Sequence, residues 1–303
     1  MSTQSSSYAR IATEDQLLGL RPKLPTYNKV WNALRSNPSM LGGLIIVVFF
    51  VVIAVIAPVI TRDSWGTLNL INRLSSPSAD NWFGTGPLGK DIYAMIVYGT
   101  RVSLTVGTAV AVMSATFGIV IGITAGYFRM LDNVIMRFMD GLMAIPGILL
   151  AISLMALLGG NLFNVIIAIT VVDTPRTARV VRSAVLSIRE QMYIDAAKAY
   201  GAQPLRILYR HVLPNTFAPV IIQATFLFAS AILVEASLSF LGAGIPITTP
   251  SWGNIIGESR AYALQAPWIV FFPSVALFLV ALAVNLFGDG LRDKLDPKLR
   301  GKN

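Results

Sequence analysis

The stretch GTGPLGKD, Gly84 to Asp91, has the spacing that most directly suggests chemistry. Its glycines and lysine match G-x-x-x-x-G-K, the pattern with which a P-loop holds nucleotide phosphates. A P-loop also needs a strand before it and a Ser or Thr after the lysine to ligate Mg²⁺. Here SSPSADNWF precedes the stretch and Asp91 follows Lys90, so a carboxylate would repel phosphate. We therefore predict a Gly/Pro turn at this position.

Other residue types that build catalytic or metal sites are scarce. The 303 residues include no cysteine and one histidine, His211. This composition excludes disulfides and thiolate metal sites, and also the two-histidine H-E-x-x-H site of metalloproteases. No Ser–His pair is indicated either. We therefore expect no catalytic residue, metal or cofactor in this chain, and we interpret His211 as a partly exposed interfacial residue.

The composition indicates a membrane protein. Hydrophobic residues make up 54% of the chain and charged residues 13%, whereas a soluble domain carries about 25% charged residues. About 20 apolar residues span a hydrocarbon core of roughly 30 Å. Six stretches meet or approach this length, and the predicted spans are 40–60, 102–127, 139–158, 162–172, 217–241 and 268–287. The fourth is the weakest, because Asp173 and Pro175 interrupt it. To cross the membrane it must continue into the polar segment that follows.

Positive charge in the loops predicts the orientation, because Lys and Arg are enriched on the cytoplasmic side. Of the 24 Lys and Arg, the N-terminal tail carries 5, the second–third connection 2, the fourth–fifth connection 7 and the C-terminal tail 5, which leaves 5 on the other side. Both termini are therefore expected in the cytoplasm. The predicted organisation is a cytoplasmic tail 1–39, a six-helix transmembrane domain 40–288 with an external loop 61–101 and a cytoplasmic loop 174–215, and a cytoplasmic tail 289–303.

Small residues repeat every four positions in the second span, which predicts close helix packing, within the chain or against another subunit. The two series are Ser103, Gly107, Ala111 and Ala115, then Gly118, Gly122 and Gly126. Pro146 in the third span removes a backbone hydrogen bond and predicts a kink.

Few ionisable residues lie at membrane depth. Glu235 is the clearest, and Asp140 and Asp173 lie nearer the cytoplasmic edge. An intramembrane acid indicates a functional site, here the translocation path, or a carboxyl group satisfied by neighbouring helices. Both interpretations remain open for Glu235. An ion-coupled carrier would need more such groups along a path, so their scarcity argues against ion coupling.

The fourth–fifth connection is long but has helical composition. Residues 187–200 are helix formers, and Gly201 follows them as a candidate C-cap. Pro204 is placed to start a second short helix, and Pro214 is expected to end it. The alanines between Asp195 and Tyr200 have short side chains that project little from the helix, so a partner could approach the helix closely.

The segment DAAKAYGAQPLRILYRHVLP resembles the EAA signature of ABC importer permeases, E-A-A-x3-G-x9-I-x-L-P. Asp replaces Glu in it, and His211 stands where Ile is common. Three further segments, FGTGPLGKDIYAMIVYGTRVSL, GYFRMLDNVIMRFMDGLMAIPGILLA and NLFGDGLRDKLDPKLR, resemble the dipeptide/oligopeptide/nickel branch of these permeases. The positions that match the EAA signature are Asp195, Ala196, Ala197, Gly201, Leu213 and Pro214.

The resemblance implies an all-α fold, six transmembrane helices with cytoplasmic EAA-type coupling helices, as in type I ABC importer permeases. It implies a non-catalytic subunit in the bacterial inner membrane, which forms half of the path for di- or oligopeptides. The implied partners are a second homologous permease, two cytoplasmic ATPase subunits that bind the ATP and Mg²⁺, an extracytoplasmic solute-binding protein and membrane lipid, but no nucleic acid. Ala197 is expected to face an ATPase.

Two kinds of alternative remain open. Within the same architecture, the solute could be a nickel chelate, glutathione or an antimicrobial peptide. In a different class, the chain could be an ion-coupled carrier, for which the EAA-like loop would have no purpose.

Overall fold

A computed structural model of the chain describes residues 37–61 and 65–295, and most of the two predicted tails lies outside these ranges. Within them the chain is helical, and its one β feature is an isolated bridge between Thr85 and Asp91. The predicted all-α class is confirmed. The long helices are α3 (Pro38–Ile60), α4 (Ile92–Tyr127), α5 (Arg129–Ala144), α6 (Gly147–Leu158), α7 (Leu162–Arg189), α10 (Leu213–Phe240) and α12 (Trp268–Leu295). The short helices are α8 (Met192–Ala199), α9 (Pro204–Ile207) and α11 (Trp252–Ser259).

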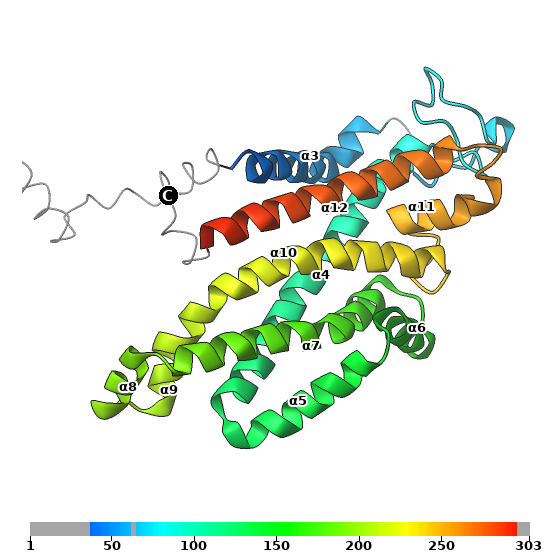
Figure 1. Ribbon diagram of the computed structural model, residues 1–303. Helices are drawn as coiled ribbons and strands as arrows, with labels where there is room; N and C mark the ends of the chain where they lie inside the picture. Colours follow the sequence, from blue (N-terminus) through cyan, green and yellow to red (C-terminus); the bar gives the residue numbers. More distant parts are fainter. Residues whose placement is uncertain (1–36, 62–64, 296–303) are drawn as a thin grey trace, which may run out of the picture.

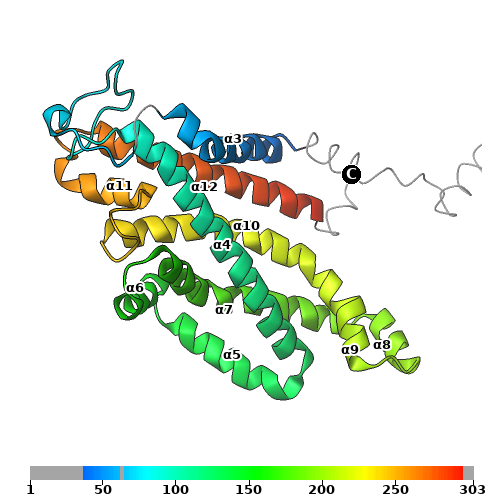
Figure 2. The ribbon, with the colours of Figure 1, turned by 180° about the vertical axis from the view of Figure 1, so that it is seen from behind.

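The long helices form a bundle with two distinct ends. α3 packs beside α12, and α10 lies between α12 and α7 (Figure 1). α4 runs diagonally across α10 and α7, and it lies in front of them when the molecule is seen from behind (Figure 2). α8 and α9 project at one end of the bundle, and α11 lies toward the opposite end.

The helix lengths agree with the predicted spans. α3, α4, the continuous stretch 204–240 and α12 are each long and apolar enough to cross a membrane. The bent pair of α5 and α6 makes a fifth span if it is counted as one. α7 has 28 residues, which correspond to about 42 Å of helix, but its charged residues exceed what an apolar span carries. The six predicted spans thus correspond to four apolar helices, the bent pair and α7.

α7 continues the fourth predicted span, as the sequence required. It runs unbroken through Asp173 and Pro175 to Arg189. Near the proline, whose missing N–H removes one helical bond, the Thr174 hydroxyl donates to the Thr170 carbonyl at 2.7 Å. Residues 174–189, which were assigned to a cytoplasmic loop, are therefore helical, and the connection to α10 is shorter than predicted.

The small residues of α4 serve packing within the chain. A Cβ added to Gly118 would lie 2.5 Å from Cγ2 of Thr177, and one added to Gly122 would lie 2.5 Å from the carbonyl oxygen of Ala178. Both contacts are with α7, which α4 could not approach so closely with larger side chains. Gly107, in the other series, faces Ile232 of α10 in the same way. Of the two interpretations of these series, the structure supports close packing inside the subunit.

The third predicted span is broken near Pro146. α5 ends at Ala144, α6 begins at Gly147, and their axes differ by 91°. The predicted kink is confirmed, although the turn is sharp enough to separate two helices. α5 also begins at Arg129, ten residues before the predicted start of the span at Met139.

The stretch from Gly84 to Asp91 is a closed turn that leads into α4. The Gly86 N–H donates to the Lys90 carbonyl at 2.9 Å, and the Asp91 carboxylate accepts from the Tyr93 N–H at 2.9 Å as the N-cap of α4. Burial raises the pKa of Glu258 in α11, and the charge of Lys90 opposes that shift. The lysine of the stretch therefore lies near a carboxyl group of the same chain.

Candidate functional site

The connection between α7 and α10 contains α8 and α9, which are joined at Gly201. We call residues 190–212 the knob. Gly201 has a φ of +78°, a left-handed conformation that glycine adopts without steric cost. Its N–H donates to the Lys198 carbonyl at 2.9 Å, and the Ala202 N–H donates to the Ala197 carbonyl at 3.0 Å. These bonds form a Schellman motif, so the predicted helix end at Gly201 is confirmed.

The knob has a buried face and an exposed face. Ile194, Ile207 and Val212 are buried in one cluster with Val181 and Val185 of α7. The exposed face carries large apolar and aromatic side chains, of the kind that mark protein interaction surfaces. These side chains are Met192, Tyr193, Tyr200, Leu205 and Tyr209.

The alanines of the signature lie on different faces of α8. Ala196 is exposed, as is Asp195, whose carboxylate pairs with Lys198 at 2.9 Å. Ala197 is half-buried and packs against the cluster under the knob. The structure thus directs Ala197 toward the core of its own chain, and Ala196 is the alanine that a partner could approach closely.

The expectation that Pro214 ends a helix is wrong. Residues 204–240 form one continuous helical stretch, in which Leu208–Val212 is π-helical. The Leu213 N–H donates to the Leu208 carbonyl, so the π turn closes immediately before Pro214, which has no N–H to donate. The wider π turn lets α9 continue into α10, so the knob is joined to α10 through helix.

The base of the knob is tied to α4 and carries His211 at its edge. The Tyr127 hydroxyl, at the end of α4, donates to the Pro204 carbonyl at 3.0 Å. His211 is half-buried, and its ring centroid lies 6.0 Å from that of Tyr193 in α8. The histidine therefore lies between the two helical parts of the knob, partly exposed as predicted.

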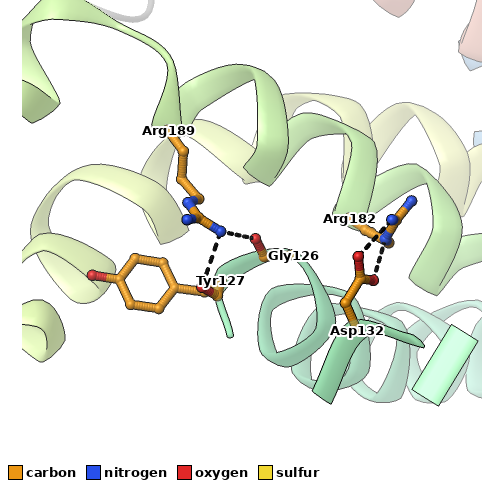
Figure 3. A network of polar contacts seen from close by, with 5 residues as sticks. All are labelled: Gly126, Tyr127, Asp132, Arg182 and Arg189. Carbon is orange, nitrogen blue, oxygen red and sulfur yellow. Dashed lines mark hydrogen bonds and ion pairs between the residues drawn. The ribbon is translucent and has the colours of Figure 1, made fainter. Parts of the chain in front are cut away.

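Two arginines of α7 join this end of the molecule to α4 and α5 (Figure 3). Arg182 donates through Nε and Nη2 to the two carboxylate oxygens of Asp132, at 2.5 and 2.6 Å. Arg189 donates through Nη1 to the carbonyls of Gly126 and Tyr127, at 2.7 and 3.0 Å. A cation at the C-terminal end of α4 also interacts favourably with the helix dipole. We call these four hydrogen bonds the arginine lock.

The sequence alone does not predict the lock. Asp132 and Arg182 are 50 residues apart, and nothing local indicates that they meet. The available signal was the series Arg176, Arg179 and Arg182, because a three-residue spacing places these side chains along one side of a helix. This spacing places the arginines on α7 but does not indicate which acids of α5 they meet.

Glu235 lies buried where α10 meets α11, far along the chain from the knob. Its exposed fraction is 0%, and its Oε1 accepts from the hydroxyls of Ser239 and Ser251, each at 2.8 Å. Asn254 of α11 donates to the carbonyls of the loop before it, including that of Thr249 at 3.0 Å. The other oxygen of Glu235, Oε2, is buried without a hydrogen-bond partner among the described residues. The contacts of Oε1 join α10 to the N-cap residue of α11 and so favour a role in fixing α11.

The two other acids of the sequence analysis have different surroundings. Asp140 is exposed and pairs with Arg179 at 2.7 Å. Asp173 is buried, and in the described residues its Oδ2 has no hydrogen-bond partner. The described ranges contain no group of three or more Asp, Glu or His side chains able to hold a metal ion.

Comparisons with known proteins agree with this geometry. Residues 118–301 match the family "Binding-protein-dependent transport system inner membrane component", and residues 27–77 match the N-terminal transmembrane domain of oligopeptide transport permease C. The chain is 45% identical to the dipeptide transport system permease protein DppC of Alkalihalophilus pseudofirmus, over 95% of this chain and 93% of that protein.

Other similar proteins are also components of transport systems. The chain is 39% identical to the oligopeptide transport system permease protein OppC of Bacillus subtilis, over 88% of each chain. It is also 39% identical to the glutathione transport system permease protein GsiD of Escherichia coli, over 91% of each. An inward-facing structure of the MetNI methionine ABC transporter matches with a TM-score of 0.57 at 20% identity, over 67% of this chain and 96% of that chain.

Proposed function

Because the chain belongs to the inner-membrane components of binding-protein-dependent transport systems and has the fold of a type I ABC importer permease, we propose that it carries di- or oligopeptides across the bacterial inner membrane. Relatives named for dipeptide and oligopeptide transport, at 39–48% identity over most of the chain, support this substrate class. The energy comes from ATP that partner subunits bind and hydrolyse with Mg²⁺.

The observation that carries the proposal is the construction of the knob. An exposed apolar face lies on two short helices whose relative orientation is fixed by the Schellman motif at Gly201. The same element is continuous with α10 and follows α7, whose end is held by the arginine lock. A displacement of the knob is therefore transmitted to α4, α5, α7 and α10 together.

The mechanism follows from this rigidity. Two cytoplasmic ATPase subunits dock on the knobs of this chain and of a second, homologous permease. When ATP closes the ATPases, the knobs move closer together and tilt their attached helices as rigid bodies. The path between the permeases then changes between inward-facing and outward-facing states, and an extracytoplasmic binding protein delivers the peptide. Asp195, Ala196, Ala197, Gly201, Leu213 and Pro214 belong to this docking and transmission element.

We infer that the knob lies in the cytoplasm and the α11 end outside, because the connection that contains the knob is rich in Lys and Arg and positive charge marks the cytoplasmic side. The chain lacks cysteine, so single cysteines at exposed Ser78 and Gln203 report the two sides. In intact cells an impermeant thiol reagent should label Ser78→Cys and spare Gln203→Cys. Labelling of position 203 alone would invert the orientation.

The function is tested in proteoliposomes that contain this chain, the second permease, both ATPase subunits and the loaded binding protein. Uptake of labelled dialanine and trialanine should require ATP on the knob side and should persist when ionophores remove ion gradients. Uptake that follows a proton or sodium gradient without ATP would support the ion-coupled carrier instead. The similarity to GsiD makes glutathione the second candidate solute, and transport of glutathione with rejection of both peptides would favour it.

A further inference from the structure

A pocket of about 380 Å³ lies where α5, α6 and α7 meet, beside the 91° break. Its wall on the side of the break is apolar and includes Leu142, Met143 and Ile145. Its wall on α7 is charged and includes Asp173, Arg176 and Arg179, of which Arg179 is paired with Asp140. The described ranges thus form an amphipathic pocket at the point where the third span changes direction.

Asp173 is the polar group in this pocket that the chain leaves unsatisfied. Its exposed fraction is 9%, and no described residue donates a hydrogen bond to its Oδ2. Oδ2 itself has almost no surface open to solvent, so only Oδ1, which also accepts no hydrogen bond from a described residue, can meet a group in the pocket. Burying a charged group without partners is costly, so this carboxyl indicates a ligand that donates to Oδ1. Asp132 and Asp140, the acids of α5, do not have this property because each already pairs with an arginine of α7.

Arg176 supplies a positive charge on the same wall of the pocket as the acid Asp173. Of the arginine series on α7, Arg179 pairs with Asp140 and Arg182 with Asp132, whereas no ion pair joins Arg176 to any described residue. The charge of Arg176 acts on Asp173, but the two side chains are not in contact as an ion pair. A hydrogen-bond acceptor and a guanidinium are therefore held apart along one wall of the pocket.

We propose that this pocket binds a short peptide by its two charged ends. Asp173 accepts hydrogen bonds from the α-ammonium group, Arg176 donates to the α-carboxylate, and the wall of Leu142, Met143 and Ile145 contacts a side chain of the peptide. The inference rests on the proposed function and narrows its substrate class to peptides whose ends are both free.

The charges of the pocket exclude simpler ligands. A metal cation would meet a single carboxylate beside a guanidinium, and the described residues offer no group of ligands for it. A simple anion could pair with Arg176 or Arg179 but would leave Asp173 without a donor. A zwitterion satisfies both groups at once, and charge-assisted hydrogen bonds at both ends give it orientation as well as affinity.

The first experiment measures occupancy directly in the assembled importer. Ile145, which is 45% exposed and lines the pocket, is changed to cysteine, and its reaction with methyl methanethiosulfonate is followed without ATP. Dialanine should slow the reaction, whereas N-acetyl-dialanine amide, which lacks both end charges, should not. The protection should disappear in the Ile145→Cys chain that also carries Asp173→Asn. Equal reaction rates with and without dialanine, or equal protection by the capped peptide, would overturn the proposal.

The second experiment measures uptake in the same reconstituted importer. Asp173→Asn and Arg176→Gln should each lower dialanine uptake at least about tenfold, the order expected for the loss of a charge-assisted hydrogen bond. The matched control is Asp293→Asn, which removes an exposed acid of α12 that does not line the pocket and should leave uptake close to wild type. Wild-type uptake in both pocket variants would refute the inference alone. Failure of the unmodified importer to couple peptide uptake to ATP would refute the proposed function instead.

Discussion

The two halves of α7 differ in whether their charged side chains have hydrogen-bond or ion-pair partners. Toward the knob, Arg182 and Arg189 are fully engaged by Asp132 and by the last carbonyls of α4. Toward the break between α5 and α6, Asp173 keeps an oxygen without a partner and Arg176 forms no ion pair with a described residue. Asp173 and Arg189 are 16 residues apart in one helix, a separation of about 24 Å.

The difference separates two tasks that one rigid helix can connect. A satisfied and tightly packed region transmits displacement, because packed elements move as units rather than deform. A region that leaves charged groups without partners beside a pocket is suited to bind a ligand that supplies those partners. The account therefore assigns transmission to the knob half of α7 and solute contact to the half near the break.

The largest effect is expected from breaking the knob itself. Gly201→Val places a β-branched side chain at a φ of +78°, where a Cβ costs about 1–2 kcal/mol and β-branching adds strain. Because nothing lies within 4 Å of an added Cβ, the cost is conformational and the knob must distort. Substrate-stimulated ATP hydrolysis and uptake should both fall, by about tenfold or more for an effect of this energy.

Gly201→Ala is the matched control, because it adds the Cβ without the branch. It should retain more of both activities than Gly201→Val, while both variants assemble with their partner subunits. Normal hydrolysis and uptake in Gly201→Val would mean that the knob is not the element that transmits motion.

A second effect is expected at the arginine lock. Arg182→Ala removes two hydrogen bonds to a carboxylate that is 19% exposed, and bonds to charged groups contribute about 1.5–3 kcal/mol before solvent screening reduces that value. The variant should lower the melting temperature of the purified complex in detergent. Lys198→Ala breaks an exposed pair with Asp195 and should change it little. Equal shifts in the two variants would remove the distinction between the lock and a surface ion pair.

Local signals in the sequence predicted much of this arrangement. The helix end at Gly201 and the kink at Pro146 depend on one residue each, and both predictions are confirmed. The sequence misled where tertiary context decides: a π turn carries α9 into α10 at Pro214, and the side chain of Ala197 packs inward. The pairing of Asp132 with Arg182 depends on how α5 lies against α7, which no local pattern contains.

The smallest effect on uptake is expected from Glu235→Gln, which tests whether this buried acid lines the translocation path. Glu235→Gln keeps an oxygen that accepts from Ser239 and Ser251, so uptake should stay within about twofold of wild type. Glu235→Leu removes that acceptor and should destabilise the chain by about 1–3 kcal/mol. A marked loss of uptake in Glu235→Gln, with normal stability and assembly, would place Glu235 on the path.

The division of tasks along α7 is tested most directly by counting peptides transported per ATP hydrolysed, in the same proteoliposomes, for Asp173→Asn and Gly201→Val. In Asp173→Asn the ratio should fall about tenfold, because uptake loses a charge-assisted contact that hydrolysis does not need. In Gly201→Val the ratio should stay near wild type, because hydrolysis and uptake fall together. Equal ratios in the two variants, or a preserved ratio in Asp173→Asn, would contradict the account.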